Sequence, residues 1–295
     1  MFFKKKTMTT QTEVPEGSWK DIWYSLRHNP RALFGLCVIA LLFIMALFAD
    51  FLAPFGMREQ NLSNALQFPN STHWFGTDDL GRDVLSRIIY GTRVSLTVGI
   101  CAVTFALIVG GILGILSGYY KGWVDTLIMR LCDILLSIPS ILLAIAIVAS
   151  LGSSLENMIF AIGLANIPIF ARIIRAGVLS VKEKQFIEAG CALGATNRLI
   201  IFKHILPNIM SPVIVQTSMG VATAILSAVG LGFIGLGVEA SIAEWGTMLN
   251  AGRSYIRTHA YLTIYPGVVI MLTILAFNLL GDGIRDAIDP KMRER

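Results

Sequence analysis

Charge is what this sequence has least of. Only 15% of its 295 residues are charged, and 55% are hydrophobic, with a mean hydropathy of +0.68. A typical soluble domain carries about 25% charged residues. Four stretches lack Asp, Glu, Lys and Arg altogether, and each could cross about 30 Å of hydrocarbon, which takes roughly 20 helical residues. A soluble helix would show charges along its outer face, so the sequence predicts an all-α integral membrane protein. The stretches are 94–120, 134–155, 204–238 and 258–281.

Nucleotide-binding and catalytic motifs are missing as well. There is no Gly-x-x-x-x-Gly-Lys-Ser/Thr and no Gly-Lys pair, so the chain has no P-loop of its own. Neither His-Glu-x-x-His nor Gly-x-Ser-x-Gly occurs, and the four His are far apart, so we expect no catalytic residue and no metal site. The four Cys, at 37, 101, 132 and 191, have no metal-ligand or redox spacing and are interpreted as small apolar fillers.

The apolar pattern predicts six membrane-spanning helices. The first begins only after about 30 residues and has no small-x-small cleavage site at its end, which favours a retained anchor over a removed signal peptide. The net charge of +5 is not taken as a sign of a nucleic-acid partner, because in a membrane protein the distribution of Lys and Arg indicates how the chain is oriented in the membrane. The expected spans are 32–53, 95–119, 128–150, 155–175, 209–236 and 261–281.

The distribution of Lys and Arg favours a cytoplasmic location for both termini. If the N-terminus is inside, 18 of the 24 Lys and Arg fall in inside segments. Cytoplasmic loops of membrane proteins carry an excess of these residues. Three of the six outside arginines cluster at 82, 87 and 93, which weakens the asymmetry without reversing it. The outside group is Arg58, Arg82, Arg87, Arg93, Arg253 and Arg257.

Residues 54–94 are too polar for a span and too long for a simple turn. Turn formers and charges mix at 76–83, and apolar residues at 84, 85, 88 and 89 have helical spacing. This pattern predicts a loop followed by a short amphipathic helix at the outer membrane surface. A solvated connector is the alternative.

Glycine and proline interrupt the spans themselves. Gly110, Gly114 and Gly118 recur every four residues and form one stripe on which another helix can approach closely. Four prolines each remove a helix hydrogen bond and should kink or break a span. Interrupted spans suit a pathway that opens and closes, although they also occur in membrane proteins that transport nothing. The prolines are Pro139, Pro168, Pro212 and Pro266.

Charges in or near the spans are candidates for function. Arg130 and Asp133 are three residues apart and are expected to form a local ion pair on one helix face. Asp50 should reach the lipid headgroups. Glu239 and Glu244 precede the last span and could face a substrate gate, although a solvated loop face is the simpler reading. Together with Pro139 and Pro168, these two glutamates are the pore or gate candidates.

A polar, helix-forming segment, the coupling loop (residues 182–207), separates the fourth and fifth spans. Residues 181–193 favour a helix, Gly194 permits a sharp turn, and a second helix should follow from Thr196, its N-cap, to about residue 205. Such a helix-turn-helix would be a rigid knob that fits a groove on a partner. The alternative is an amphipathic loop lying on the membrane.

Four blocks of the sequence carry a family resemblance. The coupling loop, with Glu188-Ala189 followed by Gly194 and closed by His204-Ile205-Leu206-Pro207, is similar to the EAA loop of ATP-binding-cassette (ABC) importer permeases. His204 stands where the general pattern has Ile, and Gly190 replaces the second Ala. The chain as a whole resembles the inner-membrane permease subunits of bacterial dipeptide and oligopeptide importers. The other three blocks are 75–87, 244–249 and 278–290.

The resemblance implies a type I ABC importer fold with six transmembrane helices in the cytoplasmic (inner) membrane. It implies a heterodimer with a sister permease, two ATPase subunits that hold ATP and Mg²⁺, and an extracytoplasmic peptide-binding protein. The chain itself would bind no cofactor and would not be an enzyme. The implied division is 1–31, a cytoplasmic segment; 32–94, the first span and an extracytoplasmic segment; 95–283, the importer core; and 284–295, a cytoplasmic tail. The ATPase-docking residues would be Glu188, Ala189, Gly190, Leu193, Gly194, Ala195 and Thr196.

Two alternatives stay open at the level of sequence. Relatives with the same blocks import nickel, glutathione or cationic antimicrobial peptides, and the sequence does not discriminate among these cargoes. A membrane scaffold or sensor that transports nothing is a different class of protein, and it would co-purify with no ATPase.

Overall fold

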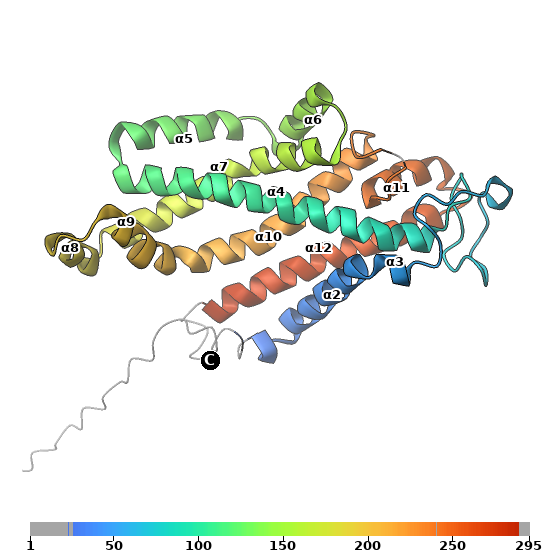
Figure 1. Ribbon diagram of the computed structural model, residues 1–295, viewed down its shortest axis with the longest axis horizontal. Coiled ribbons are helices and arrows are strands. Elements are labelled where there is room, and N and C mark those ends of the chain that lie inside the picture. Colours follow the sequence, from blue (N-terminus) through green and yellow to red (C-terminus); the bar gives the residue numbers. More distant parts are fainter. Residues whose placement is uncertain (1–22, 24–25, 240, 289–295) are drawn as a thin grey trace, which may run out of the picture.

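Five long helices run side by side in this computed structural model, which describes residues 23, 26–239 and 241–288 (Figure 1). Each is long and apolar enough to cross a membrane. Within the described residues the single β interaction is one bridge between Thr77 and Asp83. The predicted all-α membrane fold is therefore confirmed. The long helices are α2 (Pro30–Leu47), α4 (Val84–Tyr120), α7 (Leu155–Lys182), α10 (Leu206–Phe233) and α12 (Tyr261–Ile288).

A bent pair of shorter helices completes the count of up to six spans. Helices α5 (Gly122–Leu136) and α6 (Ser140–Leu151) meet at an angle of 85°. Pro139 lies at the break and is the N-cap residue of α6. Its ring cannot donate a backbone hydrogen bond and disfavours helical geometry in the residue before it, so the predicted interruption becomes a sharp corner. The remaining short elements are α3 (Ala49–Leu52), η1 (Leu62–Asn64), α8 (Gln185–Ala192), α9 (Asn197–Leu199), the π-helical turn η2 (Ile200–Ile205), α11 (Trp245–Gly252) and η3 (Arg253–Tyr255).

The glycine stripe of the second span lies against α7, as its spacing predicts. A Cβ atom at Gly110 would stand 2.6 Å from the carbonyl oxygen of Ile167, and one at Gly114 would stand 2.6 Å from that of Ala171. Neither distance is possible for a real side chain. The two backbones therefore touch because the stripe has no side chains, which is the small-residue packing expected between membrane helices. A similar contact joins α2 to α12, where a Cβ at Gly35 would lie 2.6 Å from the Ala276 carbonyl oxygen.

The predicted surface helix at 84–90 is not a separate element. Helix α4 begins at Val84, capped by the Asp83 side chain, and continues without a break for 37 residues. No proline interrupts residues 84–94, and Gly91 allows Trp245 to pack against the helix, since a Cβ there would lie 2.8 Å from the indole Cδ1. The second span therefore begins about three turns before the predicted start at 95.

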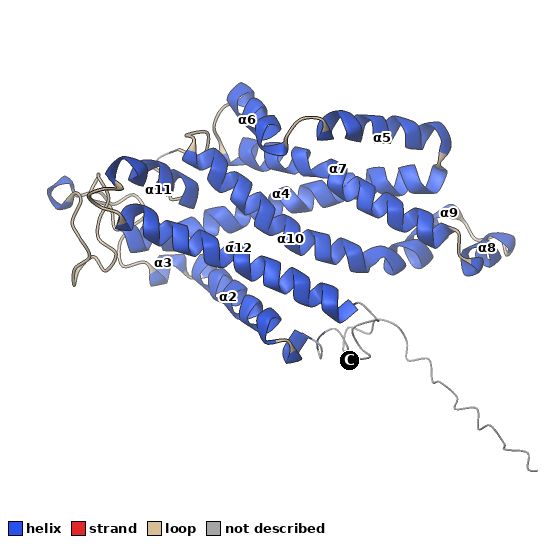
Figure 2. Ribbon diagram, turned by 180° about the vertical axis from the view of Figure 1, so that it is seen from behind, coloured by secondary structure: helices blue, strands red, loops and turns tan. Residues whose placement is uncertain are grey.

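The two ends of the helix bundle carry different structures. Helix α8 lies at one end, and the first residues of α2 and the last residues of α12 point the same way (Figures 1 and 2). The loop between α3 and α4 lies at the opposite end with α11. The expected N-terminal segment 1–31 and tail 284–295 fall largely outside the described residues, so most of their basic side chains lie outside them too.

Candidate docking hairpin and outer ionic cluster

Helix α8 ends in a tight glycine turn. Gly194 has φ of +80°, a conformation that L-residues with a Cβ rarely adopt. The Gly194 N–H donates to the Cys191 carbonyl at 3.0 Å, and the Ala195 N–H donates to the Gly190 carbonyl at 3.0 Å. These two bonds form a Schellman motif, which satisfies the last carbonyls of α8 and fixes the direction of the departing chain. The turn predicted at Gly194 is confirmed.

The chain returns from the turn as a second helical segment. The Thr196 side chain caps it by accepting from the Leu199 N–H at 3.4 Å, as predicted. Helix α9 then passes through the π-helical turn η2 directly into α10. The predicted second helix is thus helical over its whole range, although its last part is π-helix. Residues 185–205, the α8–α9 hairpin, therefore have no flexible linker on the α10 side.

The base of the hairpin is buried against the long helices. Ile187, Ile200 and Ile205 have exposed fractions of 4%, 1% and 0% and belong to one apolar cluster with α7 and α10. The rest of that cluster's buried members come from α4, α7, η2 and α10: Tyr119, Ile174, Val178, Val181, Ile201, Ile209 and Val213. A contiguous buried cluster of this kind moves as a unit, because protein interiors are close-packed.

Polar contacts hold the hairpin and the adjoining end of α7 to the end of α4. The Tyr119 hydroxyl donates to Asn197 Oδ1 at 2.8 Å. Lys182 Nζ donates to the Tyr119 carbonyl at 2.5 Å, and Lys121 pairs with Glu183 at 3.3 Å. The sequence offered no sign of these contacts, since Tyr119 and Asn197 are 78 residues apart.

The outer side of the hairpin is open. Glu188, Ala189 and Leu193 are exposed, and the exposed fraction of Leu193 is 88%. A Cβ at Gly190 or Gly194 would touch nothing within 4 Å. An exposed leucine beside bare backbone on a rigid base is a small apolar surface that a partner groove can cover. The structure gathers all seven proposed docking residues here, with Gly194 and Thr196 exposed and Gly190 and Ala195 half-buried.

The four pore or gate candidates do not form one site. Pro139 is exposed at the corner between α5 and α6, whereas Pro168 is buried within α7. Glu239 is exposed and lines a cavity of about 330 Å³ beside the end of α10 and α11.

Glu244 is not on a solvated loop face, so that expectation was wrong. It is fully buried as the N-cap of α11, where its two carboxylate oxygens accept from the Gly246 and Thr247 N–H groups, each at 2.8 Å. Burial raises the pKa of Glu244 to about 7, and the two N–H donors oppose that rise. The residue was misread because an N-cap glutamate is less usual than Ser, Thr, Asp or Asn.

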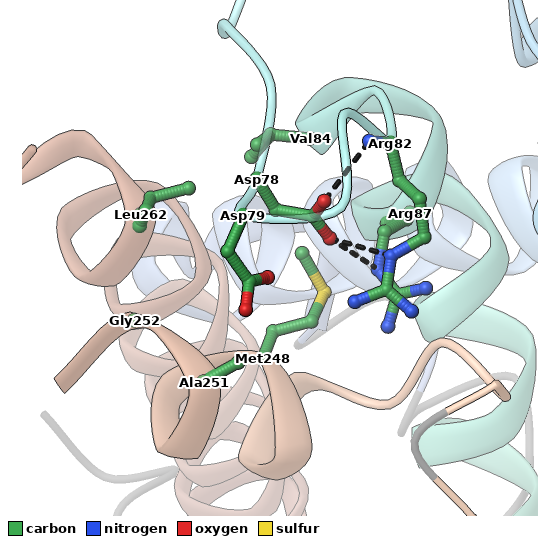
Figure 3. A pocket seen from close by; sticks show the side chains of 9 residues that line it. All are labelled: Asp78, Asp79, Arg82, Val84, Arg87, Met248, Ala251, Gly252 and Leu262. Carbon is green, nitrogen blue, oxygen red and sulfur yellow. Dashed lines mark hydrogen bonds and ion pairs between the residues drawn. The ribbon is translucent and has the colours of Figure 1, made fainter. Parts of the chain in front are cut away.

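A buried ionic cluster at the end of the bundle opposite α8 was not anticipated (Figure 3). Asp78 Oδ2 lies 2.6 Å from Arg82 Nε and 3.8 Å from Arg87 Nε, while Asp78 Oδ1 accepts from the Leu80 and Arg82 N–H groups. The three side chains line a cavity of about 20 Å³ beside Met248 of α11 and Leu262 of α12. A cavity of this size has room for about one water molecule. The cluster therefore packs the loop between α3 and α4 onto α11 and α12.

A second carboxylate ties the same loop to the start of α4. Asp83 Oδ1 lies 3.0 Å from His73 Nδ1, and Asp83 Oδ2 accepts from both the N–H and the hydroxyl of Ser86. The Ser86 hydroxyl in turn accepts from the Phe55 N–H at 3.1 Å. The alternative of a solvated connector was therefore wrong, because this loop is a folded cap with buried polar groups. The spacing of Asp78 and Arg82, four residues apart, was the available signal.

Three further ion pairs connect helices. Asp133 pairs with Arg172 of α7 at 2.6 Å, so the expected local pair with Arg130 was wrong. Asp125 of α5 pairs with Arg175 of α7, also at 2.6 Å. Asp50 pairs with Arg93 at 3.1 Å, so its carboxylate contacts a protein cation. Sequence spacing finds pairs within one helix, and these pairs lie between helices.

The hairpin combines an exposed apolar tip with a buried base. In the part of the chain that the structure describes, no three His, Cys, Asp or Glu side chains gather to hold a metal ion. The distinctive features are a rigid exposed hairpin at one end and a folded cap at the other.

Comparison with known proteins agrees with this architecture. Residues 110–294 match the family model for a binding-protein-dependent transport system inner membrane component, and residues 17–69 match the N-terminal TM domain of oligopeptide transport permease C. The dipeptide transport system permease protein DppC of Alkalihalophilus pseudofirmus is 51% identical over 93% of this chain and 90% of its own length. The glutathione transport system permease protein GsiD of Pectobacterium atrosepticum is 43% identical, covering 93% of this chain and 92% of its own.

Solved structures show the same fold at low sequence identity. A chain of the MetNI methionine ABC transporter in an inward-facing conformation has a TM-score of 0.59 and 20% identity, covering 70% of this chain and 97% of its own. The match supports the type I ABC importer fold. The chain therefore belongs to the family of inner membrane components of binding-protein-dependent transport systems and is a multi-pass membrane permease of the ABC importer class.

Proposed function

We propose that this chain is the permease subunit that carries di- and oligopeptides across the cytoplasmic membrane, driven by separate ATPase subunits that dock on the α8–α9 hairpin. The observation that carries the proposal is mechanical. The hairpin is exposed on its outer side and continuous with α10, and its base shares one buried apolar cluster with α4, α7 and α10. A displacement applied to it must therefore move the long helices.

The proposed cycle separates chemistry from transport. ATP and Mg²⁺ are held by the ATPase subunits, which close on ATP binding and draw the two hairpins of a permease pair together. The pathway then opens outward, and it returns inward after hydrolysis. The docked ATPase shifts the permease between two states only because it contacts the hairpin differently in each. The corner at Pro139 is a candidate hinge for that change.

The proposed topology follows the hairpin. An ATPase in the cytoplasm requires α8 to lie inside, which places the start of α2 and the end of α12 inside as well (Figure 1). Both termini would then be cytoplasmic, in agreement with the Lys and Arg distribution. The folded cap at 54–83 would face a peptide-binding protein outside, and a sister permease would complete the pathway. On this topology residues 1–31 and 284–295 are the cytoplasmic ends, 32–94 holds the first span and the cap, and 95–283 is the core.

Peptide cargo is the first candidate, and glutathione is the second. The relative named as a dipeptide permease is 51% identical and the one named as a glutathione permease is 43% identical. Calorimetry on the partner binding protein, with dipeptides and glutathione as ligands, distinguishes them. Tight binding of glutathione with no binding of dipeptides would favour the second cargo.

The docking role is tested by charge placed at the hairpin tip. Leu193→Asp replaces an exposed apolar contact with a carboxylate, so we expect ATPase co-purification and peptide uptake to fall at least tenfold. Membrane insertion should be unchanged, because the Leu193 side chain is 88% exposed.

A matched control lies at the opposite end of the molecule. Leu62 is also an exposed leucine, at 70%, and Leu62→Asp makes the same chemical change far from the hairpin. It should leave ATPase co-purification as in the unmodified protein. The hairpin would be rejected as the docking site if both variants lost the ATPase equally. It would also be rejected if both variants kept the ATPase.

A further inference from the structure

The ion pair between Asp133 and Arg172 lies in an unusual position for a membrane protein. Arg172 Nη2 donates to Asp133 Oδ1 at 2.6 Å, which joins α5 to α7. Both side chains are half exposed, at 51% for Arg172 and 47% for Asp133. Arg175 and Asp125, the neighbouring pair, are more covered, at 32% and 19%.

The pair lies well inside the length of helices that can cross a membrane. The ion pair between Lys121 and Glu183 marks the inner ends of α4 and α7. At 1.5 Å per residue, Asp133 is about 18 Å along α5 from Lys121, and Arg172 is about 16 Å along α7 from Glu183. The hydrocarbon layer is about 30 Å thick. On both helices the pair therefore lies about half of this thickness from the helix ends that the Lys121–Glu183 pair marks.

The surface that carries Asp133 and Arg172 is not expected to contact lipid. Charged groups at mid-membrane are costly unless they face a protein interior or water. One stripe of α4 shows an uncharged surface, since it exposes Ile108, Ile112, Leu116 and Tyr120. Along α7 no comparable run flanks Arg172, whose neighbour one turn further on is the small exposed Ala176. On α5, Leu131 and Ile134 are exposed on either side of Asp133 in the sequence.

Polar groups continue from Arg172 onto the adjoining helix. Ile173 lines a cavity of about 490 Å³ between α7, α10 and α12, together with Gln216 of α10 and Arg285 of α12. Further along α10, Thr223 is exposed. Figure 2 shows α7 between α5 and α10, so Asp133, Arg172 and Gln216 lie on neighbouring helices. The volume suits a small ligand such as a short peptide.

We propose that the Asp133–Arg172 pair lines the water-filled pathway and binds the two charged ends of a zwitterionic peptide as it passes. The guanidinium can take the peptide carboxylate, a pairing that is often bidentate, and the Asp133 carboxylate can take the peptide ammonium. The protein pair opens and two new pairs form. No charge is left unpaired at mid-membrane, and no covalent bond changes. This inference rests on the proposed function, which supplies the peptide.

Water access to this face is tested first by cysteine labelling. In a background in which the four native cysteines are replaced by serine or alanine, Ala176→Cys adds one thiol beside Arg172. Ile112→Cys is the matched control, about 14 Å along α4 from Lys121 and thus at similar depth. A membrane-impermeant maleimide applied to the assembled inward-facing complex should label Ala176→Cys at least tenfold faster than Ile112→Cys. Equal rates would overturn the assignment of this face to the pathway.

The role of the charges is tested by removing both of them. Asp133→Asn with Arg172→Gln leaves no unpaired charge, keeps the volume at position 133 and retains a polar side chain at position 172. We expect uptake of a zwitterionic dipeptide to fall at least tenfold, while the ATPase rate stimulated by loaded binding protein stays within about twofold. Uptake that falls only in proportion to the ATPase rate would show a purely structural pair and would overturn the proposal.

The outcomes separate this inference from the function on which it rests. If the unmodified complex shows no ATPase stimulation and no peptide uptake, the proposed function fails. If the unmodified complex transports peptide and the double variant transports it equally well, only the role of this pair fails. If the double variant does not assemble, the labelling ratio at Ala176→Cys alone decides whether the face meets water.

Discussion

Gly114 gives the sharpest test of how the bundle is packed. A Cβ atom at this position would lie 2.6 Å from the Ala171 carbonyl oxygen, 2.9 Å from Ile174 Cβ and 3.1 Å from the Arg175 backbone nitrogen. Two of these three atoms belong to the backbone of α7, so no rotamer change can relieve the contact. Gly114→Ala must therefore push α4 and α7 apart along their shared face, where Gly110 and Gly118 make similar contacts.

The magnitude follows from two opposing effects. Forcing one extra methyl group into a close-packed interface costs about 1–3 kcal/mol. Replacing glycine by alanine in a helix stabilises it by about 0.5–1 kcal/mol. Gly111 is the matched control, because it lies one residue away in the same helix and a Cβ there would meet only Ile174 Cδ1, at 3.5 Å. We expect Gly114→Ala to be destabilised by up to about 2 kcal/mol, and Gly111→Ala to be neutral or slightly stabilised.

Thermal unfolding of the two variants in the same detergent measures the difference. Gly114→Ala should unfold several degrees below the unmodified protein, and Gly111→Ala should unfold at or above its temperature. Equal unfolding temperatures for the two variants would refute the close backbone approach of α4 and α7.

Three further predictions concern the two ends of the molecule. The pKa of Glu244 is raised to about 7 in the folded state, so its contribution to stability is full below its unfolded pKa near 4.5 and is lost as the pH rises through 7. The difference in unfolding temperature between the unmodified protein and Glu244→Gln should therefore change between pH 5 and pH 8. A difference that stays constant over this range would contradict the raised pKa of Glu244. Asp78→Asn leaves the buried Arg82 and Arg87 without their shared carboxylate, which should cost about 3–5 kcal/mol, whereas Asp79→Asn, at a half-buried position, should cost much less in the same unfolding assay. Gly194→Val strains a residue at φ of +80° by at least about 1–2 kcal/mol and should reduce stimulated ATPase activity and peptide uptake. The control Gly267→Ala, in α12 with open space around it, should leave both activities unchanged. Similar activities in the two variants would show that the turn geometry at Gly194 does not matter.

The features predictable from sequence are those written in local patterns. The spans follow from runs of apolar residues, the stripe of Gly110, Gly114 and Gly118 follows from a four-residue spacing, and the turn at Gly194 follows from a glycine after a helical segment. Each depends on interactions within about one or two helical turns. The corner at Pro139 belongs to the same class, although its angle does not, because a proline breaks a helix without fixing the direction of the next one.

The features that sequence could not supply depend on contacts between distant segments. Asp133 was assigned to Arg130 because both lie on one helix, yet its partner Arg172 is 39 residues away. Glu244 was placed on a solvated face because nothing nearby in sequence shows that Ile88 of α4 would accept from the indole of Trp245 and bury the start of α11. The outer cap was misjudged for the same reason, since a run of charges looks exposed until α11 and α12 cover it.

The central claim is that the α8–α9 hairpin receives the work of a separate ATPase, and a photocrosslinking residue at position 193 tests it most directly. Irradiation of the assembled complex in native membranes should link this position to an ATPase subunit, and the yield should change between the nucleotide-free and ATP-bound states. Crosslinks to lipid or to the extracytoplasmic binding protein, with none to an ATPase in either state, would contradict the claim.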